Sequence, residues 1–341
     1  MLEYNLNGGV HMNNFELLSL KEEDNLTIEE KKEYYKQLRE YLSTRKLTNT
    51  TKGATTIAPK LKKITNKLAK LTCKIFADKN VEWVSDGQAN IPDGTVIFAQ
   101  THQGILDNFV WIPEIDKHCI ILHGGEVNKL LLKAQLNSGL ILVIKGDKEN
   151  NLNAKLDMIE LLSQGHSIMY CPEGTWNMSP NKLHLPLNYG FLDVARKAGV
   201  PIVPVVHEFT YDTSEPKEKI IKIHSRFGAP IYINEQDDIF AKLEEYSAAI
   251  STIRYELIEE KGIEKRSTVS NIDYVNFIKG NYRNLNLGKL NIDKERKYIY
   301  RDNPDFYEFH HINEVPFDEN GNFLETDEMI KIKKLIQKHH I

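Results

Sequence analysis

Cysteines are scarce in this sequence and long apolar runs are missing, and both absences narrow the class of protein. The 341 residues include only three cysteines, Cys73, Cys119 and Cys171. Because they are odd in number and far apart, they argue against a disulfide framework and a zinc site and favour a reducing cytoplasm. The apolar run 140–144 is far shorter than the roughly 20 residues that span a bilayer. The first residues lack a basic-then-apolar pattern, so we expect no secretory signal.

Neither sign of charge is in large excess. The chain has 44 Lys and Arg against 48 Asp and Glu, a net charge of −4. This balance argues against a strongly basic nucleic-acid-binding protein, so we expect no nucleic-acid partner. With 41% hydrophobic and 27% charged residues the composition is typical of a soluble globular protein. A cytoplasmic enzyme is therefore the expected class.

Changes in composition predict three regions: an N-terminal helical extension over 1–80, an α/β core over 81–262, and a polar C-terminal extension over 263–341 whose role the sequence does not indicate. In the first region, apolar residues at helical spacing predict a helix over 27–47, with Thr27 as N-cap and Glu30 three positions later. In the last region only a helix over 326–339 is predicted.

A second N-terminal helix is predicted over residues 58–77, where a narrow apolar stripe is flanked by lysines without an acidic residue among them. Such a basic amphipathic helix is suited to peripheral contact with an anionic membrane surface. A helix that packs on its own core and exposes a solvated lysine face has the same pattern. Both interpretations stay open.

The core region alternates short apolar runs with helical patterns. Strands are predicted at 95–99, 119–122, 140–144, 167–170 and 202–206, with a further edge strand at 220–223. Helices are predicted at 152–164, at 191–198 before Gly199, and at 237–261 before Gly262. This alternation predicts an α/β fold with a mixed, largely parallel central sheet covered by helices on both faces.

Polar residues follow two of the predicted strands, where α/β proteins place their active sites. His102 and Asp107 follow the first strand, and residues 171–177 follow the fourth. Five residues along a regular helix turn through about 140°, so the pair meets only if His102 lies in a loop and Asp107 in the next helical turn. Gly104 between them permits that bend. The spacing alone is weak, because His207 and Asp212 share it and are interpreted as a chance pair.

Four blocks in a fixed order strengthen the signal. They are the His102–Asp107 pair, residues 139–145, Pro172-Glu173-Gly174-Thr175, and residues 199–205. As a set, spread over roughly residues 81–233, they resemble the glycerolipid acyltransferases, which include lysophosphatidic acid and glycerol-3-phosphate acyltransferases. The resemblance implies transfer of a fatty acyl group from acyl-CoA or acyl-carrier protein to a hydroxyl of a lysophospholipid, glycerol phosphate or glycolipid. It implies no metal and no cofactor beyond the thioester co-substrate.

The residue types fit that chemistry. An alcohol attacks a thioester poorly until its proton is removed, and His102 suits a general base while Asp107 fixes its tautomer. With no obvious Ser or Cys nucleophile beside the pair, direct attack by the acceptor is favoured over an acyl-enzyme. The resemblance assigns substrate binding to Lys145 in the second block and to Glu173, Gly174 and Thr175 in the third. Backbone N–H groups near Gly174 are candidates for binding the oxyanion.

The third block departs from the family pattern Phe-Pro-Glu-Gly-Thr-Arg-Ser. Cys171 replaces the Phe, Trp176 the Arg and Asn177 the Ser, while Thr101 stands where the family has Asn. The family's Phe-Lys-x-Gly element appears as residues 187–190 without its Lys. Since Trp cannot imitate the charged fork with which Arg binds phosphate, we expect an acceptor other than a simple glycerol phosphate, or a phosphate held by Lys145 and residues outside the blocks. Trp176 is then predicted to stack on a sugar or to line the acyl path.

Simpler interpretations stand beside these. Glu173 is also suited to capping a helix, Lys145 to a solvated turn with Asp147, and Cys171 to plain burial. Two alternative functions remain: a soluble acyltransferase for an envelope glycan or small metabolite, and a non-catalytic lipid-binding relative. The retained pair of His102 and Asp107 argues against the second. We expect a cytoplasmic location with peripheral contact at the inner face of the membrane through residues 58–77.

Overall fold

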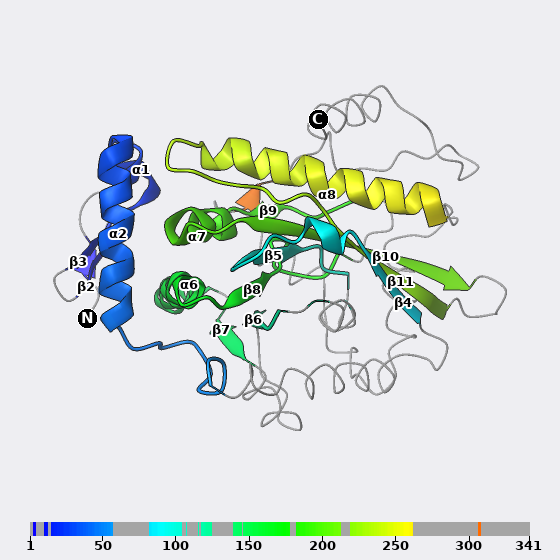
Figure 1. Ribbon diagram of the computed structural model, residues 1–341, viewed down its shortest axis with the longest axis horizontal. Helices are drawn as coiled ribbons and strands as arrows, with labels where there is room; N and C mark the ends of the chain where they lie inside the picture. Colours follow the sequence, from blue (N-terminus) through cyan, green and yellow to red (C-terminus); the bar gives the residue numbers. More distant parts are fainter. Residues whose placement is uncertain are drawn as a thin grey trace.

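The computed structural model describes residues 3–4, 10–12, 15–56, 82–103, 107, 115, 117–124, 139–144, 146–177, 182–212, 219–261 and 306–307 (Figure 1). The helices predicted at 58–77 and 326–339, and Lys145, lie outside these residues. Within the described residues, no helix has the length and apolar character that crossing a bilayer requires.

The largest sheet in the described part of the chain has seven strands in the order β4-β11-β10-β5-β8-β6-β7. Their bounds are β4 Glu82–Asp86, β5 Ile97–Gln100, β6 Cys119–Gly124, β7 Leu140–Val143, β8 Ser167–Tyr170, β10 Ile202–Asp212 and β11 Lys219–Phe227. Its neighbouring strands are parallel except for the antiparallel pair β10 and β11. The prediction of a mixed, largely parallel sheet is confirmed.

Two predictions about this sheet are wrong. β11 is not an edge strand, because β4, which was not predicted, pairs with its outer side. β10 runs to Asp212 rather than to residue 206, and its apolar run stops earlier because the next residues, His207 and Glu208, are polar yet buried. Polar residues on a strand resemble a loop in sequence when their partners come from distant parts of the chain.

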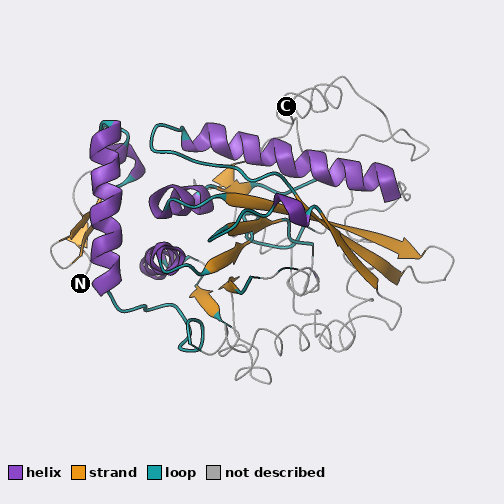
Figure 2. Cartoon of the chain, viewed as in Figure 1, coloured by secondary structure: helices purple, strands orange, loops and turns teal. Residues whose placement is uncertain are grey.

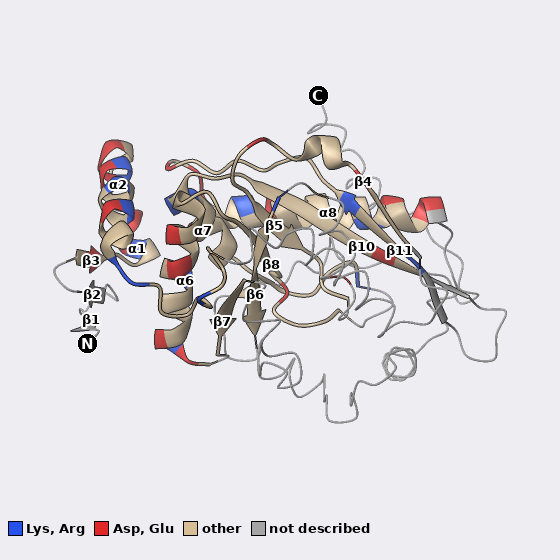
Figure 3. Cartoon of the chain, turned by 60° about the horizontal axis from the view of Figure 1, so that its bottom comes forward, with Lys and Arg blue, Asp and Glu red and all other residues tan. Residues whose placement is uncertain are grey.

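The middle of the sheet is the hydrophobic core. Every residue of β5 and β8 is buried, as expected for parallel strands covered on both faces. Figure 3 shows Lys, Arg, Asp and Glu gathered on helices such as α2 (Ile28–Thr44), whereas β5, β6, β7 and β8 contain none. The central strands are therefore held by apolar packing and backbone hydrogen bonds.

Three helices pack in succession against the sheet (Figure 2). α6 (Lys148–Ser163) contacts β7 and β8, α7 (Gly190–Ala198) contacts β5, and α8 (Ile239–Lys261) contacts β10. α6 begins one turn before its predicted start because the Asp147 side chain caps it, accepting from the Asn150 N–H. α7 ends at Gly199, which has the left-handed φ of 69° expected of a glycine C-cap.

The N-terminal extension contains the predicted helix and a small sheet that was not predicted. α2 starts with the capping box of Thr27 and Glu30, which confirms the sequence signal. Before it lie α1 (Leu20–Glu23) and three antiparallel strands, β1 Glu3–Tyr4, β2 Val10–Met12 and β3 Phe15–Leu17. Such short strands leave too little alternation in sequence to be recognised.

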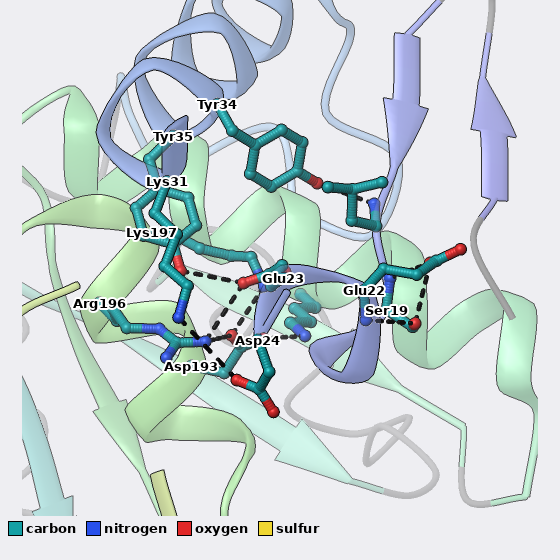
Figure 4. Close-up of polar contacts among 12 residues, drawn as sticks. Ser19, Glu22, Glu23, Asp24, Lys31, Tyr34, Tyr35, Asp193, Arg196 and Lys197 are labelled. Carbon is teal, nitrogen blue, oxygen red and sulfur yellow. Dashed lines mark hydrogen bonds and ion pairs between the residues drawn. The ribbon is translucent and has the colours of Figure 1, made fainter. Parts of the chain in front are cut away.

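A buried group of charges joins this extension to α7 (Figure 4). We call it the Glu23 cluster; it comprises Glu23, Tyr35, Asp193, Arg196 and Lys197. Glu23 Oε1 lies 2.5 Å from Lys197 Nζ, and its Oε2 accepts from Arg196 Nη2 (3.2 Å) and the Tyr35 O–H (2.9 Å). Lys197 Nζ also lies 2.7 Å from Asp193 Oδ1. Opposite charges taken from α1 and α7 therefore hold the two parts of the chain together.

A segment of the C-terminal extension returns to the core. β12 (Phe306–Tyr307) pairs antiparallel with β9 (Leu187–Asn188). The Tyr307 ring lies 4.7 Å from that of Phe240 on α8, measured between centroids. The extension therefore contributes a strand beside the segment that connects β8 to α7.

Candidate active site

The sheet topology marks one place for a site. β5 and β8 are parallel neighbours, yet the chain leaves them in opposite directions: β6 lies beyond β8, and β10 lies beyond β5 (Figure 1). Where connections diverge in this way, a crevice opens at the carboxyl ends of the two strands, and ligands of open α/β sheets bind there. The segments that follow β5 and β8 contain the predicted site residues other than Lys145, which follows β7 and lies outside the described residues.

His102 and Asp107 meet at this place, as their spacing and the intervening bend predict. His102 Nδ1 lies 3.1 Å from both Asp107 Oδ1 and Asp107 Oδ2. The Asp107 side chain has no exposed surface, and the Gln103 N–H also donates to its Oδ2 (2.5 Å). The histidine side chain keeps 13% of its surface exposed. A carboxylate facing Nδ1 favours a proton on that nitrogen, which leaves the Nε2 lone pair as the ring's proton acceptor.

Glu173 is fully buried and supports the backbone of His102. Its Oε1 accepts from the His102 N–H (2.8 Å) and its Oε2 from the Leu185 N–H (2.7 Å). Burial raises the pKa of this carboxyl to about 7, although both N–H donors, the Arg254 cation and the neighbouring His102 act in the opposite direction. The prediction that Glu173 contacts the acceptor is at odds with this position, because both oxygens face backbone donors in the interior.

The rest of the third block forms a tight turn around Gly174. The Gly174 N–H donates to the Cys171 carbonyl (3.0 Å), and its φ of 63° lies in the left-handed region that favours glycine. That N–H therefore serves the turn, and the prediction of an oxyanion donor is not met by this group. Thr175 is buried, and Trp176 is half-buried with its ring edge-on to His102, the centroids 5.9 Å apart.

Asn177 and Thr101, two of the residues that differ from the family pattern, form hydrogen bonds that support the backbone around His102. The Asn177 N–H donates to the His102 carbonyl (2.5 Å), and its side-chain amide donates to the Lys182 carbonyl (2.9 Å). Thr101 is buried, and its Oγ1 accepts from the His207 N–H (3.0 Å) on β10. Both backbone polar groups of His102 are thus engaged, one by Glu173 and one by Asn177, which fixes the histidine at the end of β5.

A buried polar layer lies beneath the pair and was missed from the sequence. His207 Nδ1 lies 2.9 Å from Ser225 Oγ and its Nε2 3.3 Å from Gln100 Oε1, so the ring has its partners without Asp212. Burial lowers the pKa of His207 to about 4, which keeps it neutral. The Gln100 amide donates to Cys171 Sγ (3.5 Å). A glutamine two positions before His102, at the end of a buried apolar strand, was the available signal for this layer.

Cys171 is unsuited to nucleophilic attack. Burial raises the pKa of its thiol far above the usual range, and the negative charges of Asp107 and Glu173 add to this effect. Because the thiolate is the reactive form of cysteine, this thiol is inert near neutral pH. The described residues also contain no group of His, Cys, Asp and Glu arranged to hold a metal ion. The partly exposed histidine next to a buried carboxylate is the arrangement suited to chemistry here.

A family comparison agrees with this arrangement. Residues 83–208 match the family model described as Acyltransferase, a range that includes His102, Asp107 and the third block. Among solved structures, the chain is similar to a 1-acyl-sn-glycerophosphate (LPA) acyltransferase, PlsC, from Thermotoga maritima. The identity is 17% and the TM-score 0.42, over 72% of this chain and 88% of the other. The search of curated proteins found no match.

Proposed function

We propose that the chain, whose residues 83–208 match the acyltransferase family model, moves a fatty acyl group from a thioester donor to a hydroxyl of a lipid acceptor. The donor is acyl-CoA or acyl-carrier protein, and the acceptor a lysophospholipid, glycerol phosphate or glycolipid. The thioester is a co-substrate, and the proposed reaction needs no metal or further cofactor. The observation that carries the proposal is a partly exposed His102 whose Nδ1 faces the buried Asp107 carboxylate at 3.1 Å.

The reaction follows from that geometry. His102 Nε2 takes the proton of the acceptor hydroxyl while its oxygen attacks the thioester carbonyl carbon, and Asp107 stabilises the imidazolium that forms. When the tetrahedral intermediate collapses, the C–S bond breaks and the departing thiolate takes the proton from His102. The acyl group is then an ester of the acceptor. Glu173 and Asn177 contribute by holding the backbone of His102, since both bond to it directly.

Removal of the imidazole tests the proposal. His102→Ala is expected to lower kcat by about 10²–10⁴-fold, the usual contribution of a general base. Free thiol released from acyl-CoA and ester formed on the acceptor are both measured. The matched control is His166→Ala, because His166 directly precedes β8 at its amino end and is half-buried. Equal activity of His102→Ala and the wild type would contradict the mechanism.

The acceptor we favour does not depend on a phosphate group. Trp176 stands edge-on to His102, where the family pattern has an arginine, so an apolar and aromatic surface borders the proposed base. Lysophosphatidic acid, monoacylglycerol and a glycolipid are assayed side by side. We expect the phosphate-free acceptors to react within about tenfold of lysophosphatidic acid, a difference of roughly 1.4 kcal/mol. Strong preference for lysophosphatidic acid would contradict this and leave Lys145 as its phosphate ligand.

A second candidate is a soluble acyltransferase that modifies an envelope glycan or small metabolite. Trp176 favours it as well, because aromatic rings stack on sugars. The membrane contact proposed through residues 58–77 separates the two. Flotation with anionic and with neutral vesicles is the measurement: binding only to anionic vesicles supports a lipid acceptor at the cytoplasmic membrane face. Failure to bind either favours the soluble acceptor.

A further inference from the structure

We propose that Arg254 on α8 is a positioning residue for His102. The proposal rests on the function proposed above and extends it to a residue outside the matched range 83–208. α8 carries no predicted site residue, and Arg254 does not touch the reacting atoms. Its influence runs through the chain segment 182–185. This segment forms hydrogen bonds to Glu173 and Asn177, the two residues that bond to the His102 backbone.

Arg254 is a fully buried charge, with 1% of its surface exposed. Its Nη1 donates to the carbonyls of Lys182 (3.0 Å) and Leu183 (2.6 Å), and its Nε donates to Glu208 Oε2 on β10 (3.2 Å). The planar guanidinium presents several donors in fixed directions, so one side chain bridges two carbonyls and a carboxylate. Arg254 thereby ties the segment 182–185 to α8 and to the sheet.

The same segment holds the two groups that fix His102. The Leu185 N–H donates to Glu173 Oε2, whose other oxygen accepts from the His102 N–H. The Asn177 side chain donates to the Lys182 carbonyl, and the Asn177 N–H donates to the His102 carbonyl. Two separate routes therefore lead from the backbone of His102 to the segment that Arg254 anchors. A shift of this segment moves both, and misplacing a catalytic group by about 1 Å can cost 10²-fold in rate.

Charge adds a second route of influence. Arg254 opposes the burial that raises the pKa of Glu173, as does the neighbouring His102, while Cys171 and Tyr246 pack near the same carboxyl. Without Arg254 the pKa of Glu173 rises further from its value of about 7, so the carboxyl is mostly protonated at neutral pH. A protonated oxygen cannot accept from a backbone N–H as the carboxylate does, and one of the two contacts weakens.

Arg226 offers a matched control. It lies on β11 and also binds α8, with its Nη2 2.8 Å from Glu260 Oε2 and its Nε 2.7 Å from Asp86 Oδ1. Its ion-pair partners, Asp86, Glu256 and Glu260, do not lie in the segment 182–185. Loss of Arg226 therefore weakens the attachment of α8 to the sheet without disturbing the hydrogen bonds that connect Arg254, through the segment 182–185, to the His102 backbone.

The variants are Arg254→Lys, Arg254→Met combined with Glu208→Gln, and Arg226→Met. The double substitution removes both charges of the buried pair, so no unpaired carboxylate remains to prevent folding. We expect kcat to fall by about tenfold or more in the double variant with a smaller change in KM for acyl-CoA, because the fully buried Arg254 has no surface on which to bind the donor. We also expect the acid limb of the kcat profile to move to higher pH. Arg254→Lys should recover part of the rate, and Arg226→Met should match the wild type.

A second readout does not depend on turnover. The Nδ1–H proton of His102, identified by its loss in His102→Ala, is followed by NMR and should shift in the Arg254 variants but not in Arg226→Met. An unchanged kcat, pH profile and Nδ1–H resonance in the folded double variant would overturn the inference, as would equal losses in Arg226→Met. If His102→Ala is itself fully active, the proposed function fails. If His102→Ala is inactive and the double variant is normal, only the role of Arg254 fails.

Discussion

Replacing Glu23 with glutamine tests whether buried charge attaches the N-terminal extension to the core. Glu23 has no exposed surface and contacts Lys197, Arg196 and the Tyr35 O–H (Figure 4). Glutamine keeps the shape of the side chain and an oxygen for the tyrosine, but it leaves two buried cations with Asp193 as their remaining partner within the cluster. Removing one partner of a buried pair costs about 3–5 kcal/mol, and the retained tyrosine contact places our expectation near about 3 kcal/mol.

The measurement is urea unfolding followed by circular dichroism. Glu22→Gln serves as the control because Glu22 is the adjacent acid on α1 and forms the capping box with Ser19. Its loss should cost about 1 kcal/mol or less. Tyr35→Phe should cost about 1.5–3 kcal/mol in the wild type, as for a hydrogen bond to a charged group, and less in the Glu23→Gln background, where the tyrosine faces a neutral amide. If Glu23→Gln costs no more than Glu22→Gln, the cluster does not stabilise the attachment.

Three further predictions concern the site. Asp107→Asn should lower kcat by about 10²–10⁴-fold in the thiol-release assay, because a neutral amide cannot stabilise the imidazolium; a normal rate would remove Asp107 from the mechanism. His207, with a folded pKa of about 4, makes stability fall as pH drops from 6.5 to 4, whereas Glu173, at about 7, makes it fall as pH rises from 4.5 to 7. The two pH dependences oppose each other in the wild type. In His207→Gln only that of Glu173 remains, so the free energy of unfolding measured with urea should fall by about 3 kcal/mol as pH rises from 4.5 to 7. A pH dependence of stability parallel to that of the wild type would contradict this. Gly174→Ala and Gly94→Ala both place a side chain at positive φ and should each cost about 1–2 kcal/mol, but only Gly174→Ala should lower kcat; equal rates would show that the turn is not needed.

The central sheet could be predicted because its strands are marked by composition alone. Residues 167–170 form a strand with the predicted bounds, and Gly199 ends α7 as its position indicates. β4 was missed because Glu82–Asp86 has acids at both ends and a serine within it. The polar half of β10 was missed for a related reason, since burial of His207 and Glu208 depends on partners far away in sequence.

The same distinction holds within the site. His102 and Asp107 lie five residues apart, so the contact is local and the bend that forms it is visible in sequence. The resemblance alone assigned Glu173 to substrate binding, and only the tertiary structure reveals that its side chain is buried against two backbone N–H groups. Arg254 lies 72 residues from Lys182, and nothing in the sequence around it indicates that the two meet.

The pairing of β12 with β9 bears on where the protein can be shortened. The Asn188 N–H donates to the Pro172 carbonyl, so β9 is joined on one side to the residue before Glu173 and on the other to Phe306 and Tyr307. A chain cut after residue 262 would lose that outer strand and leave β9 with an open edge, where unpaired backbone groups invite association with other chains. The part of the chain that supports the proposed site therefore extends past α8 and includes the two residues of β12 from the C-terminal extension.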